Sequence, residues 1–338
     1  MFLKLFKIKS LLQKTNKLTA LRKGFFCSVL IAFSASFISG HYGGPVMLYA
    51  LLFGMAFHFL YEDKSCVAGI DLASQTVLKI GIALLGVRIS FTQIVHLGLF
   101  PVCVVGLGIL TTILLGVVLA KKFGYSKHLG MLTGGAVAIC GVSAAMAIAA
   151  ILPQTKQAKR DLLMTVAVIT SLSTLAMIVY PLIVSIFNLN NSQAALFLGG
   201  TIHDVAQVIG AGYMLSDVVG ETSIIVKLVR ITFLTPVMLC IGLVCQQEKT
   251  SSKVHVPLFL ILFFVFVGLV NMNLIPMPLV LFFQSVSRWC ILIAISALGM
   301  KTSLKELSIV GFKPLFLMGA QTIWLALFIL GSCLFFLS

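Results

Sequence analysis

Two stretches of this chain differ from the apolar sequence around them: GGAVAICGVS at residues 134–143 and GGTIHDVAQ at residues 199–207. Each begins with a glycine pair and then places polar groups within sequence that is otherwise apolar. The second puts an imidazole and a carboxylate side by side, at His203 and Asp204, where hydrocarbon is expected. A bilayer makes such groups costly, so they need partners, water or a passing solute. We therefore expect a buried polar site at these two segments.

The composition around them is that of a polytopic membrane protein. Of the 338 residues, 60% are hydrophobic and 10% are charged, and the mean hydropathy is +1.13. No ordinary soluble domain of this size approaches these values. A membrane-spanning helix needs about 20 predominantly apolar residues, and the sequence predicts nine such spans, at residues 24–40, 45–61, 73–95, 98–120, 162–187, 223–245, 256–272, 279–300 and 314–336. With the glycine-pair segments at 129–152 and 194–215, we expect an all-α protein with nine to eleven transmembrane helices.

The distribution of basic residues indicates how the chain is oriented in the membrane. The net charge of +15 lies mainly in the N-terminal arm and in short connectors, which argues against nucleic acid as a partner. We predict a basic cytoplasmic arm over residues 1–23 and a single transmembrane domain over residues 24–338. Because basic residues beside the first span usually mark the cytoplasmic side, the expected location is the inner membrane, with the N-terminus inside. The lipid bilayer is the expected partner, and a homodimer is compatible with the sequence.

One connector separates two topological models. If residues 129–152 cross the membrane fully, Lys156, Lys159 and Arg160 lie outside, against the positive-inside rule. If the segment enters and leaves on the cytoplasmic side, these residues lie inside, and residues 194–215 enter from the opposite face, as in an inverted repeat. The charges favour re-entrant segments slightly, although many transporters use full but broken helices.

A second internal similarity supports an inverted-topology repeat. Residues 83–90, ALLGVRIS, resemble residues 297–303, ALGMKTS, with Leu85 matching Leu298, so that Arg88 corresponds to Lys301. The two motifs lie in spans that run in opposite directions. Chance similarity of small residues in apolar sequence is the alternative. Arg88 and Lys301 could attract an anion at each mouth of a pathway, or could extend to the lipid headgroups.

The second glycine-pair segment carries the ionisable groups. His203 and Gln207, four residues apart, share a helix face, Asp204 points to a neighbouring one, and Thr201 adds a hydroxyl. Such groups can exchange protons during a transport cycle. The alternative is a hydrogen-bonded network that locks helices together.

The first segment offers weaker polar groups. Cys140 and Ser143 could face the same cavity, or could pack and bond locally. Gly135 and Gly200 allow backbone to leave helical geometry, where free N–H groups bind anions and free carbonyls bind cations. Close helix packing is the alternative for these glycines.

Charged residues elsewhere receive simpler interpretations. Further candidates for attracting an anion are Lys227 and Arg230, near the start of their span, and Arg288 and Asn273, with an interfacial position as the alternative. We expect Glu62 and Asp71 to lie in a cytoplasmic connector. The eight cysteines include no CxxC pair, so reduced, packing cysteines are expected.

Enzyme motifs are missing from the sequence. Neither HExxH nor a GxxxxGK[ST] loop is present, and we expect no metal, cofactor or catalytic residue. A hydrolase built from Ser143, His203 and Asp204 lacks the final glycine of GxSxG, and adjacent His203 and Asp204 are poorly placed for a triad.

The motifs at residues 83–90, 138–144 and above all 200–208, GTIHDVAQV, resemble those of the sulfate exporter family, the YeiH-type bacterial inner-membrane proteins. The resemblance runs from about residue 24 to the end of the sequence. More distantly, the chain is similar to bile-acid/sodium symporters and cation/proton antiporters. This resemblance implies a panel-plus-core architecture and elevator-like alternating access. In the first segment, Gly134–Gly135–Ala136–Val137 stands where a more polar Gly-Thr-Ala-Val run is expected.

The sequence therefore predicts a secondary active transporter of a small anionic solute such as sulfate or a sulfonate, with protons or cations as the coupling ion. The alternatives are a channel-like pore and, less favoured, a membrane hydrolase using Ser143.

Overall fold

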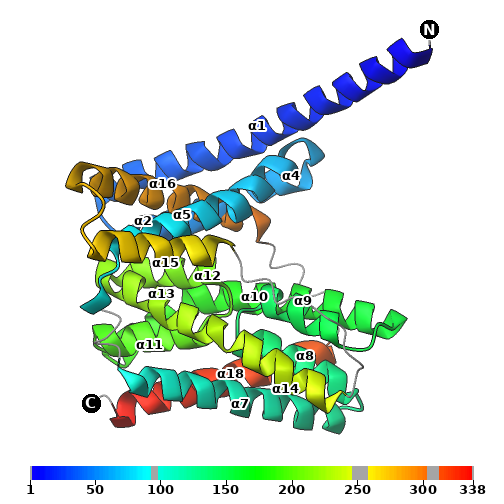
Figure 1. Cartoon of the computed structure of the whole chain (residues 1–338), viewed down its shortest axis with the longest axis vertical. Helices are drawn as coiled ribbons and strands as arrows, with labels where there is room; N and C mark the ends of the chain where they lie inside the picture. The colour runs from blue at the N-terminus through cyan, green and yellow to red at the C-terminus, as the bar shows by residue number, and fades with distance from the viewer. Residues whose placement is uncertain (1, 93–97, 246–257, 303–311, 337–338) are drawn as a thin grey trace. The chain divides into compact units, whose positions relative to one another are not determined.

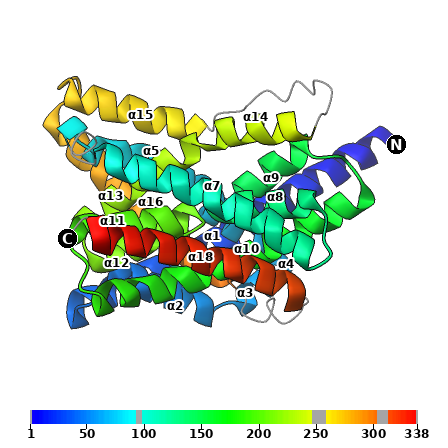
Figure 2. The same ribbon diagram turned by 90° about the horizontal axis from the view of Figure 1, so that it is seen from below.

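The computed structural model describes residues 2–92, 98–245, 258–302 and 312–336, which are mainly helical and contain no strand. The chain divides into two compact units. Unit 1 comprises Met1–Ser90 and Val256–Ser303, and unit 2 comprises Phe91–His255 and Leu304–Ser338. Figures 1 and 2 show the helices of both units in two views.

Unit 1 combines the start of the chain with a later helical pair. Its elements are α1 (Phe2–Tyr42), α2 (Val46–Ala56), α3 (Phe59–Glu62), α4 (Lys64–Asp71), the π-helix η1 (Leu72–Val77), α5 (Leu78–Leu85), the 3₁₀ turn η2 (Gly86–Arg88), α15 (Leu258–Asn271) and α16 (Met277–Lys301). Helix α1 continues without a break past residue 23, the predicted boundary of the arm. Helices α2 and α16 approach closely, because a Cβ added to Gly54 would lie 2.9 Å from the Gly299 Cα.

The second long helix of unit 1 differs from its prediction. It runs from Lys64 to Arg88 through η1 and is apolar enough to cross a membrane, whereas the predicted span began at residue 73. Asp63 caps its start by accepting the Ser65 amide at 2.9 Å. Asp71 therefore lies within this helix and not in a connector. The prediction was wrong here because hydropathy alone penalises the polar residues of Lys64–Asp71, although Asp63 caps the start of this helix and Asp71 at its end pairs with Lys301.

Unit 2 contains both glycine-pair segments. Its elements are α7 (Leu99–Lys122), α8 (Lys127–Ala138), α9 (Val142–Ile151), α10 (Lys156–Ile186), α11 (Asn191–Thr201), α12 (Val205–Leu215), α13 (Asp217–Thr232), α14 (Leu234–Val244) and α18 (Phe312–Phe336). Each glycine-pair segment is thus a pair of short helices joined by a three-residue link, and each link interrupts an otherwise apolar run.

Helices α8 and α9 form a re-entrant hairpin. Helix α8 packs antiparallel to α7, since Gly130 meets Val117 and Gly134 meets Ile113. Helix α9 then returns to the end from which α8 came, because Ser126 and His128 line one pocket with Leu152 and Thr155. Twelve residues rise about 18 Å, roughly half of the distance needed to cross a bilayer. The basic start of α10 consequently lies at the same end as the start of α8, as the re-entrant model predicted.

Helices α11 and α12 form the second re-entrant hairpin. Asn190 and Gln193 cap its first helix in a reciprocal capping box. The hairpin opens at the other end of α10, because Asn188 and Asn191 line a pocket with Leu215 and Ser216. Figure 1 shows α8 and α9 near one end of α10 and α11 and α12 near the other. The two hairpins therefore enter from opposite ends of the same long helix, which is the arrangement of inverted segments.

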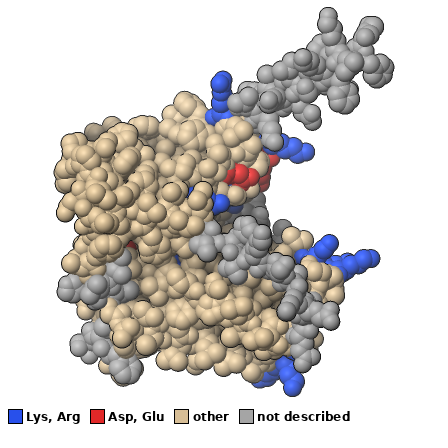
Figure 3. All heavy atoms as spheres, in the orientation of Figure 1, with Lys and Arg blue, Asp and Glu red and all other residues tan. Residues whose placement is uncertain are grey.

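The helix lengths confirm an all-α polytopic membrane protein. Seven described helical stretches are long and apolar enough to cross a membrane. The predicted spans at 45–61 and 256–272 correspond to the shorter apolar helices α2 and α15, with 11 and 14 residues. Charged side chains are sparse on the face drawn in Figure 3, and many large apolar side chains are exposed, such as Leu243 at 80%. Such a surface suits lipid.

Candidate functional site

The tips of the two hairpins meet inside unit 2. The link of the first hairpin is Ile139–Cys140–Gly141, and the link of the second is Ile202–His203–Asp204. Gly141 has a φ of +65°, which a residue with a Cβ adopts only with strain. A Cβ added to Gly141 would lie 3.5 Å from the His203 Cβ. The two links are therefore in van der Waals contact.

Both tips leave backbone carbonyls without helical partners. Helix α8 ends at Ala138 and helix α11 ends at Thr201, and the last carbonyls of a helix have no intrahelical donor. These ends also carry the negative partial charge of the helix dipole. Buried carbonyls of this kind require donors from elsewhere, since an unpaired one costs about 1–3 kcal/mol.

Two basic residues of α13 supply these donors. The Lys227 Nζ donates to the Ile139 carbonyl at 2.8 Å and to the Ile202 carbonyl at 2.7 Å, so it joins the two hairpin tips directly. The side chain is fully buried, at 0% exposure.

Arg230 completes the same cap. Its guanidinium donates to the carbonyls of Val137 and Ala138 at the end of α8, and to that of Ile202 at 2.9 Å. A longer contact of 3.5 Å reaches the Gly199 carbonyl of α11. Arg230 is also 0% exposed. Together, Lys227 and Arg230 form what we call the carbonyl cap, which holds the two half-helix C-termini against each other.

His203 is part of the same contact. Its Nδ1 lies 3.0 Å from the Val137 carbonyl oxygen, which can only accept, so Nδ1 carries a proton. Its Nε2 lies 3.2 Å from the Thr322 hydroxyl of α18. The ring is 0% exposed. His203 therefore links the first hairpin to α18. This contact agrees with the alternative given above, a hydrogen-bonded network that holds helices together.

The beginning of α12 is held by the middle of α10. The Asp204 side chain accepts the Ala206 amide at 2.8 Å, and its own amide donates to the Ser173 hydroxyl at 3.0 Å. The buried Gln207 donates from Nε2 to the Thr174 hydroxyl at 2.9 Å, while its Oε1 has no hydrogen-bond partner among the described residues. This acceptor is available to water or to a solute.

The other predicted residues of unit 2 lie along the hairpins. Cys140 is buried in the first link, and Ser143 is exposed in the first turn of α9. The Thr201 hydroxyl donates to the Phe197 carbonyl of its own helix. Gly135 accommodates Ile148 of the returning helix, and Gly200 packs against Ile329 of α18, so both permit close helix packing.

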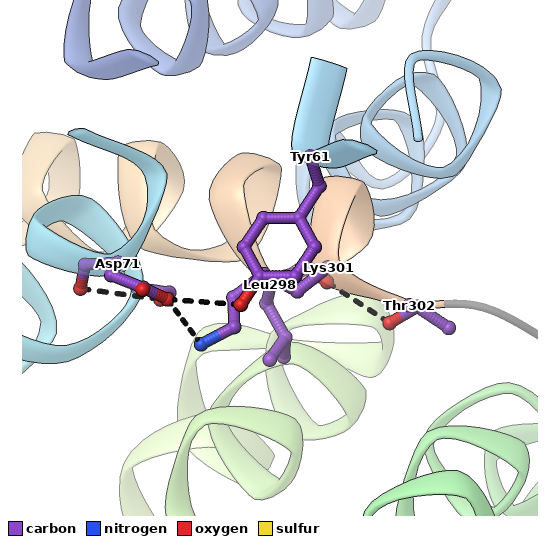
Figure 4. A network of polar contacts seen from close by, with 6 residues as sticks. Tyr61, Asp71, Leu298, Lys301 and Thr302 are labelled. Atoms are coloured by element: carbon purple, nitrogen blue, oxygen red, sulfur yellow. Dashed lines mark hydrogen bonds and ion pairs between the residues drawn. The ribbon is translucent and has the colours of Figure 1, made fainter. Parts of the chain in front are cut away.

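The two predicted anion-attracting residues belong to unit 1. Arg88 ends η2. The Lys301 Nζ forms an ion pair with the Asp71 Oδ1 at 2.7 Å, and the Tyr61 hydroxyl donates to the same oxygen at 3.3 Å (Figure 4). Lys301 also lies over the Tyr61 ring, with its nitrogen 5.6 Å from the centroid. Its charge is thus already balanced by Asp71.

Sequence reasoning missed the carbonyl cap. Lys227 and Arg230 were candidates for attracting an anion, with an interfacial position as the alternative, and that alternative is wrong for side chains with no exposed surface. The sequence contained a signal for this site. Lys227 and Arg230 are three residues apart and therefore share a helix face, and the apolar residues around them indicate a position away from the lipid headgroups. No group of three His, Cys, Asp or Glu side chains in the described ranges could hold a metal ion.

Comparison with known proteins identifies relatives over almost the whole chain. Residues 23–318 match the family model described as conserved hypothetical protein 698. A UPF0324 membrane protein of Chlorobaculum tepidum is 50% identical over 315 residues, covering 91% of this chain and 88% of the relative. The UPF0324 membrane protein TauZ of Paracoccus pantotrophus is 44% identical, with 90% and 93% covered.

A more distant relative carries the name that the sequence motifs suggested. The UPF0324 inner membrane protein YeiH of Escherichia coli is 30% identical over 294 residues, covering 84% of this chain and 83% of the relative. No solved structure matches the chain. The chain belongs to the YeiH-type UPF0324 family of membrane proteins.

Proposed function

We propose that this protein is a secondary active transporter of a small anionic solute, with sulfate or a sulfonate as the favoured class. The observation that carries the proposal is the meeting of two oppositely directed hairpin tips at a buried carbonyl cap. Irregular backbone at membrane depth is tolerated where it lines a cavity or is buried in protein. Transporters place solute sites at such discontinuous helices.

An anionic solute fits the start of α9, where the N-cap residue makes no side-chain cap. Its first-turn amides have no intrahelical acceptor, and its N-cap residue, Gly141, has no side chain to bind them. The exposed Ser143 hydroxyl lies in the same turn. The positive end of a half-helix favours an anion, and the buried guanidinium of Arg230 behind the tips adds to this preference.

The coupling role falls to Asp204. Asp204 is partly exposed, unlike His203. It is the N-cap residue of α12, so binding of a cation or a proton to its carboxylate would change the charge at the start of that helix. The free Gln207 Oε1 offers a neutral acceptor one turn later in the same helix. Division of the chain into two compact units is compatible with the panel and core of an alternating-access carrier.

The test uses purified protein in liposomes and the substitution Asp204→Asn. Asparagine caps helices as well as aspartate does, so the start of α12 is retained while its charge is removed. We expect counterflow of labelled sulfate or sulfonate to be lost in Asp204→Asn, with the thermal transition within a few degrees of wild type. Asp161→Asn, which removes a carboxylate of unit 2 at the base of the first hairpin, serves as the matched control. Wild-type counterflow in Asp204→Asn would contradict the assignment.

The same assay separates the alternatives. A channel on the same scaffold gives no stimulation by solute on the opposite side, whereas a carrier exchanges labelled for unlabelled solute. A hydrolase using Ser143 would need His203 as its base, but both ring nitrogens of His203 are engaged by Val137 and Thr322. Labelling of Ser143 by a serine-directed probe would favour that alternative.

A further inference from the structure

Unit 1 contains a polar hollow of about 410 Å³ between α1, α2 and α16. Its lining includes the Arg288 side chain and three serines, Ser36, Ser39 and Ser285, and no acidic residue. Arg288 lies near the middle of α16 (Met277–Lys301), a helix long and apolar enough to span a membrane. A cation at this position in a bilayer requires a counter-charge or access to water.

Three of the hydrogen-bond donors that line this hollow have no partner among the described residues, whereas the Ser39 hydroxyl donates to the Gly44 carbonyl at 2.7 Å. Among the described residues, Arg288 has no hydrogen bond or ion pair, and neither the Ser36 nor the Ser285 hydroxyl has a partner. Other hydroxyls on these helices donate to their own backbone, as Ser34 does to Leu30 at 2.9 Å. The exposed Arg288 and Ser285 and the partly buried Ser36 therefore line one hollow with donors that have no partner among the described residues.

This donor set matches an oxyanion. Arginine presents a planar fork that pairs with phosphate oxygens through two parallel hydrogen bonds, and each serine hydroxyl can donate one more. With no acidic residue in the lining, the space carries one uncompensated positive charge. Its volume exceeds what a single inorganic anion needs and leaves room for the glycerol of a phosphodiester.

The surroundings of the hollow favour an anion with an apolar tail. Phe33 and Phe37 of α1 are 55% and 62% exposed, and Phe282 of α16 is 59% exposed. Phe33 packs on Trp289, a lining residue, with ring centroids 4.7 Å apart. An acyl chain could lie along these exposed rings while its headgroup fills the hollow.

We propose that this hollow is a binding site for a phosphate group, held by Arg288, Ser36 and Ser285, with the headgroup of an anionic phospholipid as the favoured source. The site is separate from the hairpin tips, so it does not depend on the transport proposal.

The test is native mass spectrometry of the full-length protein titrated with phosphatidylglycerol or phosphatidylcholine. We expect the wild-type protein to retain phosphatidylglycerol preferentially, and Arg288→Gln to bind it about tenfold more weakly, as for loss of a charge-assisted hydrogen-bond pair. Lys79→Gln is the matched control, because Lys79 is an exposed cation within another span of unit 1 that does not line the hollow. Its binding should equal that of wild type.

A second variant protects the test against misfolding of Arg288→Gln. The double change Ser36→Ala and Ser285→Ala keeps the charge and should weaken retention several-fold. Thermal shifts with inorganic phosphate form the other arm: stabilisation of wild type but not of Arg288→Gln, without lipid retention, would assign the site to a free anion. Equal binding of both ligands by wild type and Arg288→Gln, or equal losses in Arg288→Gln and Lys79→Gln, would overturn the proposal.

Discussion

Replacing Arg230 by methionine is expected to destabilise unit 2 by about 1–5 kcal/mol. The Ala138 carbonyl loses the one side-chain donor that the described residues give it, and the Gly199 carbonyl loses its 3.5 Å contact. The Val137 carbonyl keeps His203, and the Ile202 carbonyl keeps Lys227. One buried unpaired carbonyl costs about 1–3 kcal/mol, and removing a cation from a helix C-terminus adds up to about 2 kcal/mol.

The usual compensation for removing a buried charge does not apply here. A hydrophobic residue can replace a buried ion pair without loss when both partners are removed together. The acceptors of Arg230 are backbone carbonyls, which no side-chain substitution removes. The cost of Arg230→Met therefore remains in the folded state.

Lys227 provides a sharper test of the same reasoning. Lys227→Met should cost about 1–3 kcal/mol, because among the described residues it leaves one carbonyl, that of Ile139, without a side-chain donor. In the double variant the Ile202 carbonyl loses both donors at once. The double loss should therefore exceed the sum of the single losses by about 1–3 kcal/mol.

The assay is equilibrium unfolding in mixed detergent micelles, followed by circular dichroism, with Lys122→Met as a control at the exposed end of α7. Strictly additive losses would show that the shared Ile202 carbonyl has another partner when the cap is removed. Single losses below about 0.5 kcal/mol, the range of ordinary surface substitutions, would refute the carbonyl cap as a stabilising element.

Three further predictions concern local geometry. Gly141→Ala should lower stability by about 1–2 kcal/mol in the same unfolding assay, because the φ of +65° at this position disfavours a residue with a Cβ. An unchanged unfolding transition would contradict this backbone conformation at Gly141. Asp71→Asn and Lys301→Gln should each cost at most about 1 kcal/mol, since the pair is partly exposed, and a double-variant cycle that gives no coupling would exclude a contribution from the ion pair. The Ser65 amide and hydroxyl lower the Asp63 pKa. The stability that these hydrogen bonds contribute is therefore present above the ordinary aspartate pKa and is lost as the pH falls through the lowered value. Ser65→Ala should raise the Asp63 pKa in a carboxyl NMR titration, and an unchanged pKa would refute the assignment.

Hydropathy and glycine pairs predicted much of this fold because both reflect local requirements. A long apolar run must be helical in lipid, and the pairs at 134–135 and 199–200 mark the two segments that are interrupted. The charges at Lys156 and its neighbours favoured re-entrant segments, and the hairpin geometry agrees with that model. Helix ends were less predictable, as at Asp71, because caps and ion pairs decide them.

The carbonyl cap could not be derived from the sequence in the same way. The acceptors of Lys227 are backbone atoms 88 and 25 residues away, and a carbonyl carries no residue identity by which to recognise it. Only the fold brings the ends of α8 and α11 to α13. For Lys301, likewise, the partner Asp71 lies in a different part of the chain, so the sequence could show a cation but not its neutralisation.

The π-helix η1 has a consequence for the spacing of residues along its span. A π-turn accommodates one residue more than an α-turn over a similar length, so the side chains before Leu72 and after Val77 are out of phase with a single α-helical repeat. Deletion of one residue between 72 and 77 can restore an uninterrupted α-helix with both flanking faces in place, whereas the same deletion in α5 rotates everything beyond it by about 100°. A one-residue deletion in η1 is therefore expected to keep Asp71 and Arg88 on their present helix faces.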